Sequence, residues 1–144
     1  FDHSALIGHQ MRKDEYSSLK KIYSDQLRLI MEFIKLITID EFSEIELRVG
    51  TIQEALPFTE AINPSYKLKI DFGPYGKKWS SAQITANYNA EDLIGRQIVS
   101  AMNLGTKKIG DFKSEVLVLG HNDKNGNVIL LEPDKEIQNG ALVN

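Results

Sequence analysis

The hydrophobic residues follow two different periods along the chain. From Asp14 to Ile37 they recur every three or four positions, and the stretch contains neither glycine nor proline. This spacing predicts one helix with a hydrophobic side. Such a helix either docks on its own domain or, read as heptads, pairs with another helix in a short coiled coil. The hydrophobic positions are Tyr16, Leu19, Ile22, Tyr23, Leu27, Ile30, Phe33, Ile34 and Ile37.

After this helix the period changes to two, which is the period of a half-buried β-strand. The alternation is regular in Ile45–Ile52 and has no exception in Tyr66–Phe72. Shorter hydrophobic runs predict further strands. These runs are Trp79–Thr85, Gln97–Met102, Glu115–Leu119 and Val128–Leu131.

Residues that favour caps and turns separate these strands. Thr38–Glu41 has the pattern of a capping box for a short helical turn. Asn89 is placed to cap a short helix that stops at Gly95. The Asn-Gly pair at 125–126 predicts a hairpin, and Gly50 is placed for a bulge or a sharp bend in its strand. The segments Pro57–Pro64 and Gly73–Gly76 are expected to be a loop and a turn.

Several short strands, with one small helix between the third and the fourth, are typical of a five-stranded Greek-key barrel. The sequence therefore predicts an all-β fold with short capping helices and an added N-terminal amphipathic helix. We expect two parts: a tail and helix at residues 1–37, and the barrel at residues 38–144.

Little in the sequence indicates catalysis. The chain has no cysteine, which excludes disulfides, thiolate metal sites and cysteine nucleophiles. His3, His9 and His121 are too far apart in the sequence to suggest a metal site, so we expect neither a metal nor another cofactor. Ser80 and Ser81 do not lie in a nucleophile elbow. We therefore expect a protein that is not an enzyme.

Charge and hydropathy limit the choice of partner. No hydrophobic run approaches the roughly 20 residues of a membrane span, and no signal peptide is recognised, so we expect a cytoplasmic protein without a membrane span. The net charge of −3 argues against general binding of nucleic acid, because phosphate contacts dominate its affinity. Such binding would require lysines that gather on one face.

Candidate binding residues lie beside the predicted strands. Lys107 and Lys108 are expected in a loop that follows the turn-like segment Asn103–Thr106, and Lys67 and Arg48 project from strand faces. Loops and the exposed face of a five-stranded barrel of this kind, the OB-fold, are where nucleic acid binds. For a single lysine on a strand, such as Lys67, a plain solvated face is the more common explanation, whereas the Lys107/Lys108 pair is equally compatible with binding.

Polar and aromatic side chains add to this candidate surface. Asn103 or Ser114 would hydrogen-bond a base edge or a 2′-hydroxyl group of RNA. Trp79 and Tyr75 would stack on bases, although a single tryptophan beside a strand is more often a core or interface residue.

Several motifs in one order resemble the tRNA-binding-domain family, and specifically its small stand-alone branch, the CsaA-type secretion chaperones. The resemblance covers nearly all of the chain from Thr38 onward. The matching segments are Arg48–Ile52, Asn63–Gly73, Ser80–Thr85, Glu91–Val99, Lys108–Gly120, Leu130–Asp134 and Asn139–Ala141.

The resemblance implies an OB-fold homodimer, with Ser80–Thr85 near the interface, that binds tRNA without regard to its sequence. The alternative it implies is an export chaperone that binds unfolded preproteins. The positions that match the family's shared surface motif are Asn103, Lys107, Lys108, Ser114 and Glu115. After Asn103 this chain has Leu104-Gly105-Thr106, where the family usually has an aromatic residue or leucine and then two prolines, so we expect a more flexible loop there.

Overall fold

The computed structural model describes residues 12, 13, 15 and 35–144. The chain divides into two compact units, Phe1–Glu44 and Ile45–Asn144, and each is described by itself. The helix expected from Asp14 to Ile37 lies almost entirely outside the described residues. Of its described positions, residue 15 is helical, whereas residues 35–37 are not.

Helix α3, Ile39–Ser43, follows in the first unit. The Thr38 hydroxyl accepts a hydrogen bond from the Glu41 amide, and the Glu41 carboxylate accepts one from the Thr38 amide. This reciprocal pair confirms the predicted capping box. Within the described part of the chain, no helix is long and apolar enough to cross a membrane.

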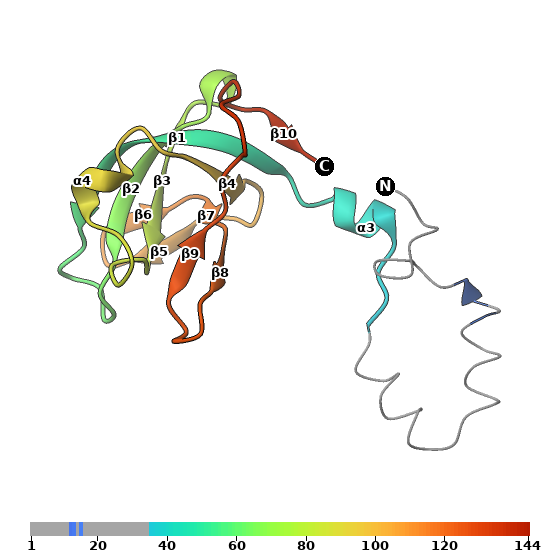
Figure 1. Cartoon of the computed structure of the whole chain (residues 1–144), viewed down its shortest axis with the longest axis horizontal. Coiled ribbons are helices and arrows are strands. Elements are labelled where there is room, and N and C mark those ends of the chain that lie inside the picture. The colour runs from blue at the N-terminus through green and yellow to red at the C-terminus, as the bar shows by residue number, and fades with distance from the viewer. Residues whose placement is uncertain (1–11, 14, 16–34) are drawn as a thin grey trace, which may run out of the picture. The chain divides into compact units, whose positions relative to one another are not determined.

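The second unit is an antiparallel sheet curved into a nearly closed barrel (Figure 1). Its main strands lie in the order β3-β2-β1-β4-β7, which confirms the predicted five-stranded barrel. Their bounds are Leu47–Pro57 for β1, Tyr66–Asp71 for β2, Lys77–Ala82 for β3, Gln97–Ala101 for β4 and Leu117–Val118 for β7.

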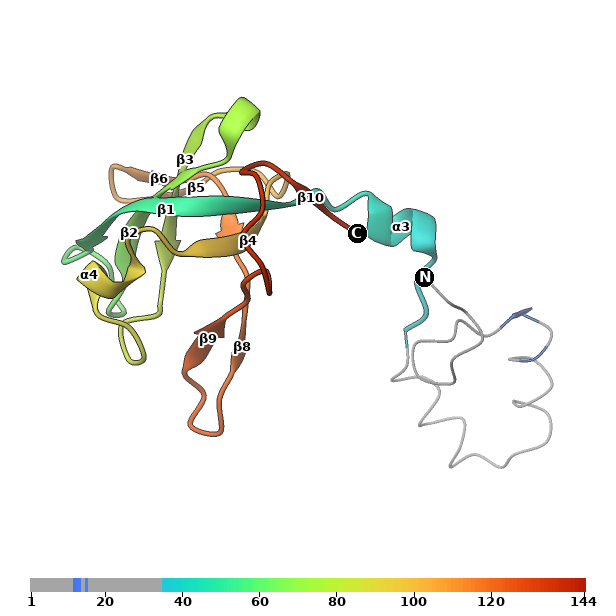
Figure 2. The same cartoon turned by 45° about the horizontal axis from the view of Figure 1, so that its top comes forward.

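Smaller elements complete the barrel. The 3₁₀ helix η1, Gly73–Tyr75, joins β2 to β3, and helix α4, Ala90–Leu93, lies between β3 and β4. Two hairpins project from the barrel, and Figure 2 shows them on different sides. They are β5–β6, Lys107–Ile109 with Phe112–Ser114, and β8–β9, Gly120–Asn122 with Val128–Leu130. Strand β10, Leu142–Val143, pairs with the start of β1.

Three local predictions need correction. The segment with Lys107 and Lys108 is a strand of a hairpin and not a loop. Strand β1 continues to Pro57, five residues beyond the predicted end at Ile52. Asn89 precedes α4 as expected, but its side chain makes no capping hydrogen bond to the backbone.

The irregularity in β1 lies between Ile52 and Glu54, where the pairing with β2 shifts, and not at Gly50. Gly50 serves another purpose. A Cβ atom there would lie 2.6 Å from Ile70 Cγ2 and 2.7 Å from the Phe72 ring. The absence of a side chain therefore lets two core residues pack against the β1 backbone.

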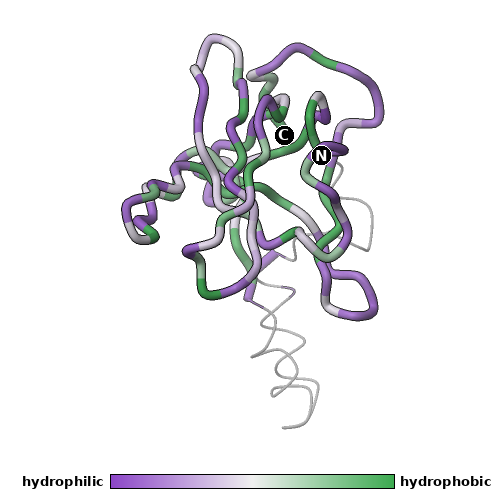
Figure 3. Tube along the Cα trace, turned by 90° about the vertical axis from the view of Figure 1, so that its left-hand side faces the viewer, coloured by the Kyte–Doolittle hydropathy of each residue, from purple (hydrophilic) through white to green (hydrophobic). Residues whose placement is uncertain are grey.

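The barrel interior is filled by side chains from every second strand position, as the alternation predicted. The fully buried hydrophobic side chains are Ile52, Leu68, Ile70, Phe72, Leu93 and Ile98. In Figure 3 most of the hydrophilic trace follows the outer loops, whereas hydrophobic segments run through the barrel. Helix α4 supplies Leu93, which packs in this core.

The outer edge of β3 is closed by the last residue of β6 and by the chain that follows it. The Glu115 amide donates to the Trp79 carbonyl at 2.8 Å, and the Ser81 amide donates to Ser114 Oγ at 3.0 Å. The buried Ser80 hydroxyl donates to the Val116 carbonyl at 2.8 Å. These bonds occupy the edge of β3, so this part of the strand has no free edge to offer a partner.

Candidate nucleic-acid interface

The β5–β6 hairpin gathers three lysines. Lys107 pairs with Ser114 across the hairpin, and Lys108 pairs with Lys113. All three lysines are exposed. None of them makes an ion pair within the described part of the chain. The hairpin therefore presents positive charge to solvent although the whole chain carries a net charge of −3.

Lys67 lies on the outer face of β2, beside this hairpin. Its ammonium group is 4.7 Å from the centre of the Phe58 ring and 5.3 Å from that of Phe112. A weak ion pair of 3.9 Å joins it to Glu60, whose side chain is 68% exposed. An exposed pair at this distance contributes little to stability, so the lysine can exchange Glu60 for another anion.

Aromatic side chains bring β6 onto the outer face of the sheet. Phe112 meets Phe58 edge to face with ring centres 5.1 Å apart, and Trp79 with ring centres 6.0 Å apart. Of these three aromatic residues, only Trp79 is indicated as a binding residue by the sequence pattern. The sequence does contain a signal for Phe112. It is an aromatic residue between Asp111 and Lys113 in a short polar stretch, where a side chain without an apolar contact would be expected to be polar.

Ser114 and Glu115 lie at the junction between the hairpin and the barrel. Ser114 Oγ accepts the hydrogen bond from Ser81 that closes the β3 edge. The Glu115 carboxylate lies 3.8 Å from the Lys78 ammonium group and is one-third exposed. Both residues thus have structural partners, while Glu115 still lines an open groove beside Trp79 and Phe112.

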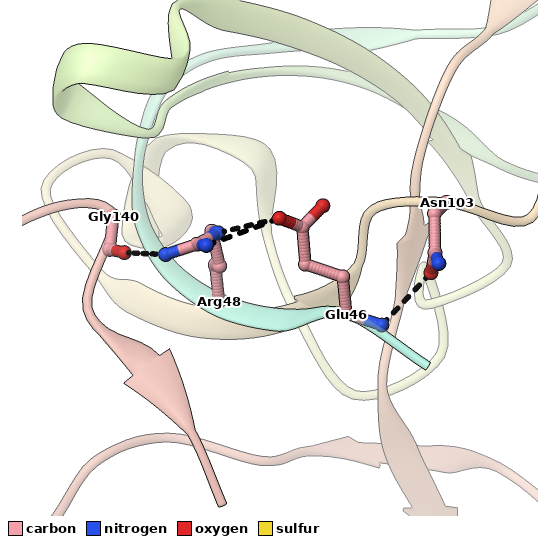
Figure 4. A network of polar contacts seen from close by, with 4 residues as sticks. All are labelled: Glu46, Arg48, Asn103 and Gly140. Carbon is pink, nitrogen blue, oxygen red and sulfur yellow. Dashed lines mark hydrogen bonds and ion pairs between the residues drawn. The ribbon is translucent and has the colours of Figure 1, made fainter. Parts of the chain in front are cut away.

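Arg48 and Asn103 lie together at the other end of β1 (Figure 4). Asn103 Oδ1 accepts a hydrogen bond of 2.8 Å from the Glu46 amide. Arg48 donates to the Glu46 carboxylate at 3.1 Å and to the Gly140 carbonyl at 2.8 Å. Its guanidinium also covers the Tyr75 ring at 3.7 Å. These contacts fix the start of β1 to the C-terminal segment.

The structure thus divides the seven predicted site residues into two groups. One group surrounds the β5–β6 hairpin and the outer sheet face, and it consists of Lys67, Lys107, Lys108, Ser114 and Glu115. The other group, Arg48 and Asn103, is linked through Glu46.

Asp123 organises the turn of the β8–β9 hairpin. Its carboxylate accepts hydrogen bonds from the amides of Asn125 and Asn127 at 2.8 and 2.9 Å, and from the Asn87 side chain at 3.2 Å. The Asn127 amide, followed by the Asn87 side chain, lowers the pKa of Asp123 below its usual value because both stabilise the charged form.

The family model for a tRNA binding domain matches residues 47–142, the span from the first residue of β1 to β10. The chain belongs to the tRNA-binding-domain family. This match confirms the family suggested by the sequence motifs, and its fold confirms the OB-fold. The family domain is a binding module and not a catalytic one.

Two CsaA chaperones of known structure are similar to this chain. The chaperone CsaA from Bacillus anthracis is 47% identical with a TM-score of 0.73, and the match covers 76% of this chain and 100% of that one. The CsaA chaperone protein from Picrophilus torridus is also 47% identical, with a TM-score of 0.71 and the same coverage.

Among curated proteins, methionine–tRNA ligases share the domain. The ligase of Leptospira biflexa is 38% identical over 107 residues, which are 74% of this chain. The chain spans only about 15% of the length of that ligase. The domain therefore occurs both in chains of its own size and as a part of much longer enzymes.

Proposed function

We propose that this protein binds tRNA without catalysing a reaction. The family match over residues 47–142 supports this function. One observation indicates where on the surface tRNA would bind. The three lysines of the β5–β6 hairpin face solvent, and none of them makes an ion pair in the described chain. Such groups release counterions when they neutralise phosphates, which drives binding to nucleic acid.

The seven predicted site residues are assigned two roles in this proposal. Lys67, Lys107 and Lys108 contact RNA phosphates directly, because their ammonium groups are accessible or weakly paired. Arg48, Asn103 and Ser114 hold the elements that shape the surface. Glu115 has a share in both roles, since it pairs with Lys78 and also lines the groove.

Assembly and location belong to the same proposal. We infer a cytoplasmic homodimer, as the family resemblance implies. Leu117 is 51% and Leu142 is 55% exposed, so both side chains are accessible to a second copy. The edge of β3 is already occupied at Trp79 and Ser81, so a contact at these two positions would use side chains and not added strand pairing. Light scattering tests the dimer, and a particle of 16.3 kDa would contradict it.

A titration with bulk tRNA at two salt concentrations tests the function. We expect binding that weakens as salt rises, and weaker binding for the double variant Lys107→Ala/Lys108→Ala. Each lost phosphate contact should lower the slope of log affinity against log salt by about 1. The control is Lys124→Ala/Lys135→Ala, which removes the same charge elsewhere. Equal affinities for the two double variants would refute the hairpin site.

A second function is favoured by one observation, the 47% identity to two CsaA chaperones over their full length. In this alternative the barrel binds unfolded polypeptides before export. Suppressed aggregation of an unfolded client, with no binding of tRNA at low salt, would place this function first.

A further inference from the structure

The chain contains two Asn-Gly pairs, and the structure holds them very differently. Asn125-Gly126 lies in the turn of the β8–β9 hairpin, which projects from the barrel (Figure 2). Asn139-Gly140 lies in the segment before β10, which is bound to the barrel. Because the two pairs have the same covalent structure, a difference in their chemistry has to come mainly from the fold.

An Asn-Gly pair can react within itself. The glycine amide nitrogen attacks the carbonyl carbon of the asparagine side chain, so that a new C–N bond forms and the bond to the side-chain nitrogen breaks. The amide proton leaves with that nitrogen, so ammonia is released and a cyclic imide remains. Water then opens the imide at either of its carbonyl groups, which gives aspartate or isoaspartate. Glycine favours the attack because it has no side chain to obstruct it.

Asn125 and Gly126 are placed to reach this geometry. Both residues are exposed, and the Asn125 side chain makes no hydrogen bond to the described part of the chain. A Cβ atom on Gly126 would meet nothing within 4 Å beyond its chain neighbours, so space is open around the attacking residue. The Gly126 amide donates to the Asp123 carbonyl at 3.0 Å. One exposed turn bond is weak, so local opening of the turn releases this nitrogen.

Asn139 and Gly140 are held away from this geometry. Asn139 Oδ1 accepts hydrogen bonds from Thr51 Oγ1 at 2.6 Å and from Gln97 Nε2 at 3.2 Å. Gly140 is buried, and its amide donates to the Val49 carbonyl at 2.7 Å. Both reacting groups are therefore bound to the barrel, and they meet only when the segment leaves it.

We propose that Asn125 is a site of spontaneous modification, at which the folded protein converts asparagine into a mixture of isoaspartate and aspartate. Each conversion adds one negative charge to the turn. Isoaspartate also adds a methylene group to the main chain between residues 125 and 126.

The added methylene group acts on the contacts of Asp123. Its carboxylate accepts hydrogen bonds from the amides of Asn125 and Asn127, at 2.8 and 2.9 Å, and these amides lie on either side of the lengthened point. A longer turn strains this pair of bonds. The Asn87 side chain donates to the same carboxylate at 3.2 Å, so the change extends to the loop before α4.

Peptide mapping of the full chain tests the site. The protein is incubated at neutral pH in buffer and, in parallel, in concentrated urea, and it is digested at intervals. Chromatography separates the aspartate and isoaspartate peptides, and mass spectrometry locates them. In buffer we expect conversion at Asn125 to be severalfold faster than at Asn139. In urea the two rates should become similar, because the fold no longer distinguishes the pairs. Equal rates in buffer, or the same difference in urea, would overturn the proposal.

Two variants test the route and its consequence. Gly126→Ala, measured in urea, should slow conversion at residue 125 severalfold and leave Asn139 as the internal control unchanged. An unchanged rate, or aspartate as the only product, would mean direct hydrolysis of the side-chain amide and would overturn the cyclic route. Asn125→Asp adds the charge alone. The Asn127 amide signal in NMR should shift more in the isolated isoaspartate form than in this variant, and equal shifts would overturn the role of the longer main chain.

Discussion

At the scale of single residues, the Arg48 guanidinium already has partners within the chain. It is only 14% exposed, shares a carboxylate oxygen of Glu46 between two donors at 3.1 and 3.0 Å, and lies flat on Tyr75. Its third nitrogen donates to the Gly140 carbonyl. A sequence shows a positive charge at this position, but it does not show that three partners already surround that charge.

We expect Arg48→Lys to lower the free energy of unfolding by about 1–3 kcal/mol, because lysine can neither form the forked hydrogen bonds nor stack as arginine does. The affinity for tRNA should remain within about twofold of wild type, because the guanidinium contacts Glu46, Gly140 and Tyr75 and is not available to a phosphate. Urea denaturation and a tRNA titration measure the two quantities. Reduced affinity at unchanged stability would instead make Arg48 an RNA contact.

Two hairpins illustrate the scale of the element. The strands of β5–β6 have three residues each, too short for an alternating pattern to stand out, so the sequence suggested a loop. The β8–β9 hairpin was predicted from its Asn-Gly pair. Its turn is nevertheless organised by Asp123, whose carboxylate gathers the amides of Asn125 and Asn127.

The Asp123 turn should loosen in acid. Its pKa is lowered in the folded state, foremost by the hydrogen bond from the Asn127 amide. The stabilisation is therefore present above the ordinary pKa of 3.8 and is lost as pH falls through the lower, folded value. NMR should show the Asn125 and Asn127 amide signals shifting below about pH 4. In Asp123→Asn these shifts should disappear, and their persistence would mean that another group is responsible.

At the scale of the whole molecule, the barrel unit accounts for the family match. The domain model covers residues 47–142, and two CsaA chaperones are matched over 100% of their length by 76% of this chain. The net charge of −3 is unevenly distributed, because exposed lysines gather on one hairpin. An acidic chain can therefore present a locally positive surface to RNA.

We expect residues 38–144 alone to unfold cooperatively and to bind tRNA as the full chain does. The thermal midpoint should change by less than ~4 °C, the shift that about 1 kcal/mol produces in a domain of this size. Calorimetry and the tRNA titration on both lengths test this. A clear loss of affinity in the shorter chain would show that the first 37 residues take part in binding or assembly.

The sequence by itself determined local structure in both units. Alternation along Tyr66–Phe72 decided which side chains face the core, and Thr38 and Glu41 capped α3 as their spacing required. Both effects act between near neighbours, so a single sequence displays them. The ordered motifs from Arg48 onward added the family, and with it the OB-fold.

Only the tertiary structure decided which distant side chains meet. Phe58, Trp79 and Phe112 come from three separate segments and form one cluster, and no local pattern announces their contact. In the same way, the pairing of β1 with β2 places the bulge between Ile52 and Glu54 and not at Gly50. Gly50 is instead the point where core side chains pack closely on the backbone. Contacts of this kind depend on register and closure of the barrel, which are properties of the folded chain as a whole.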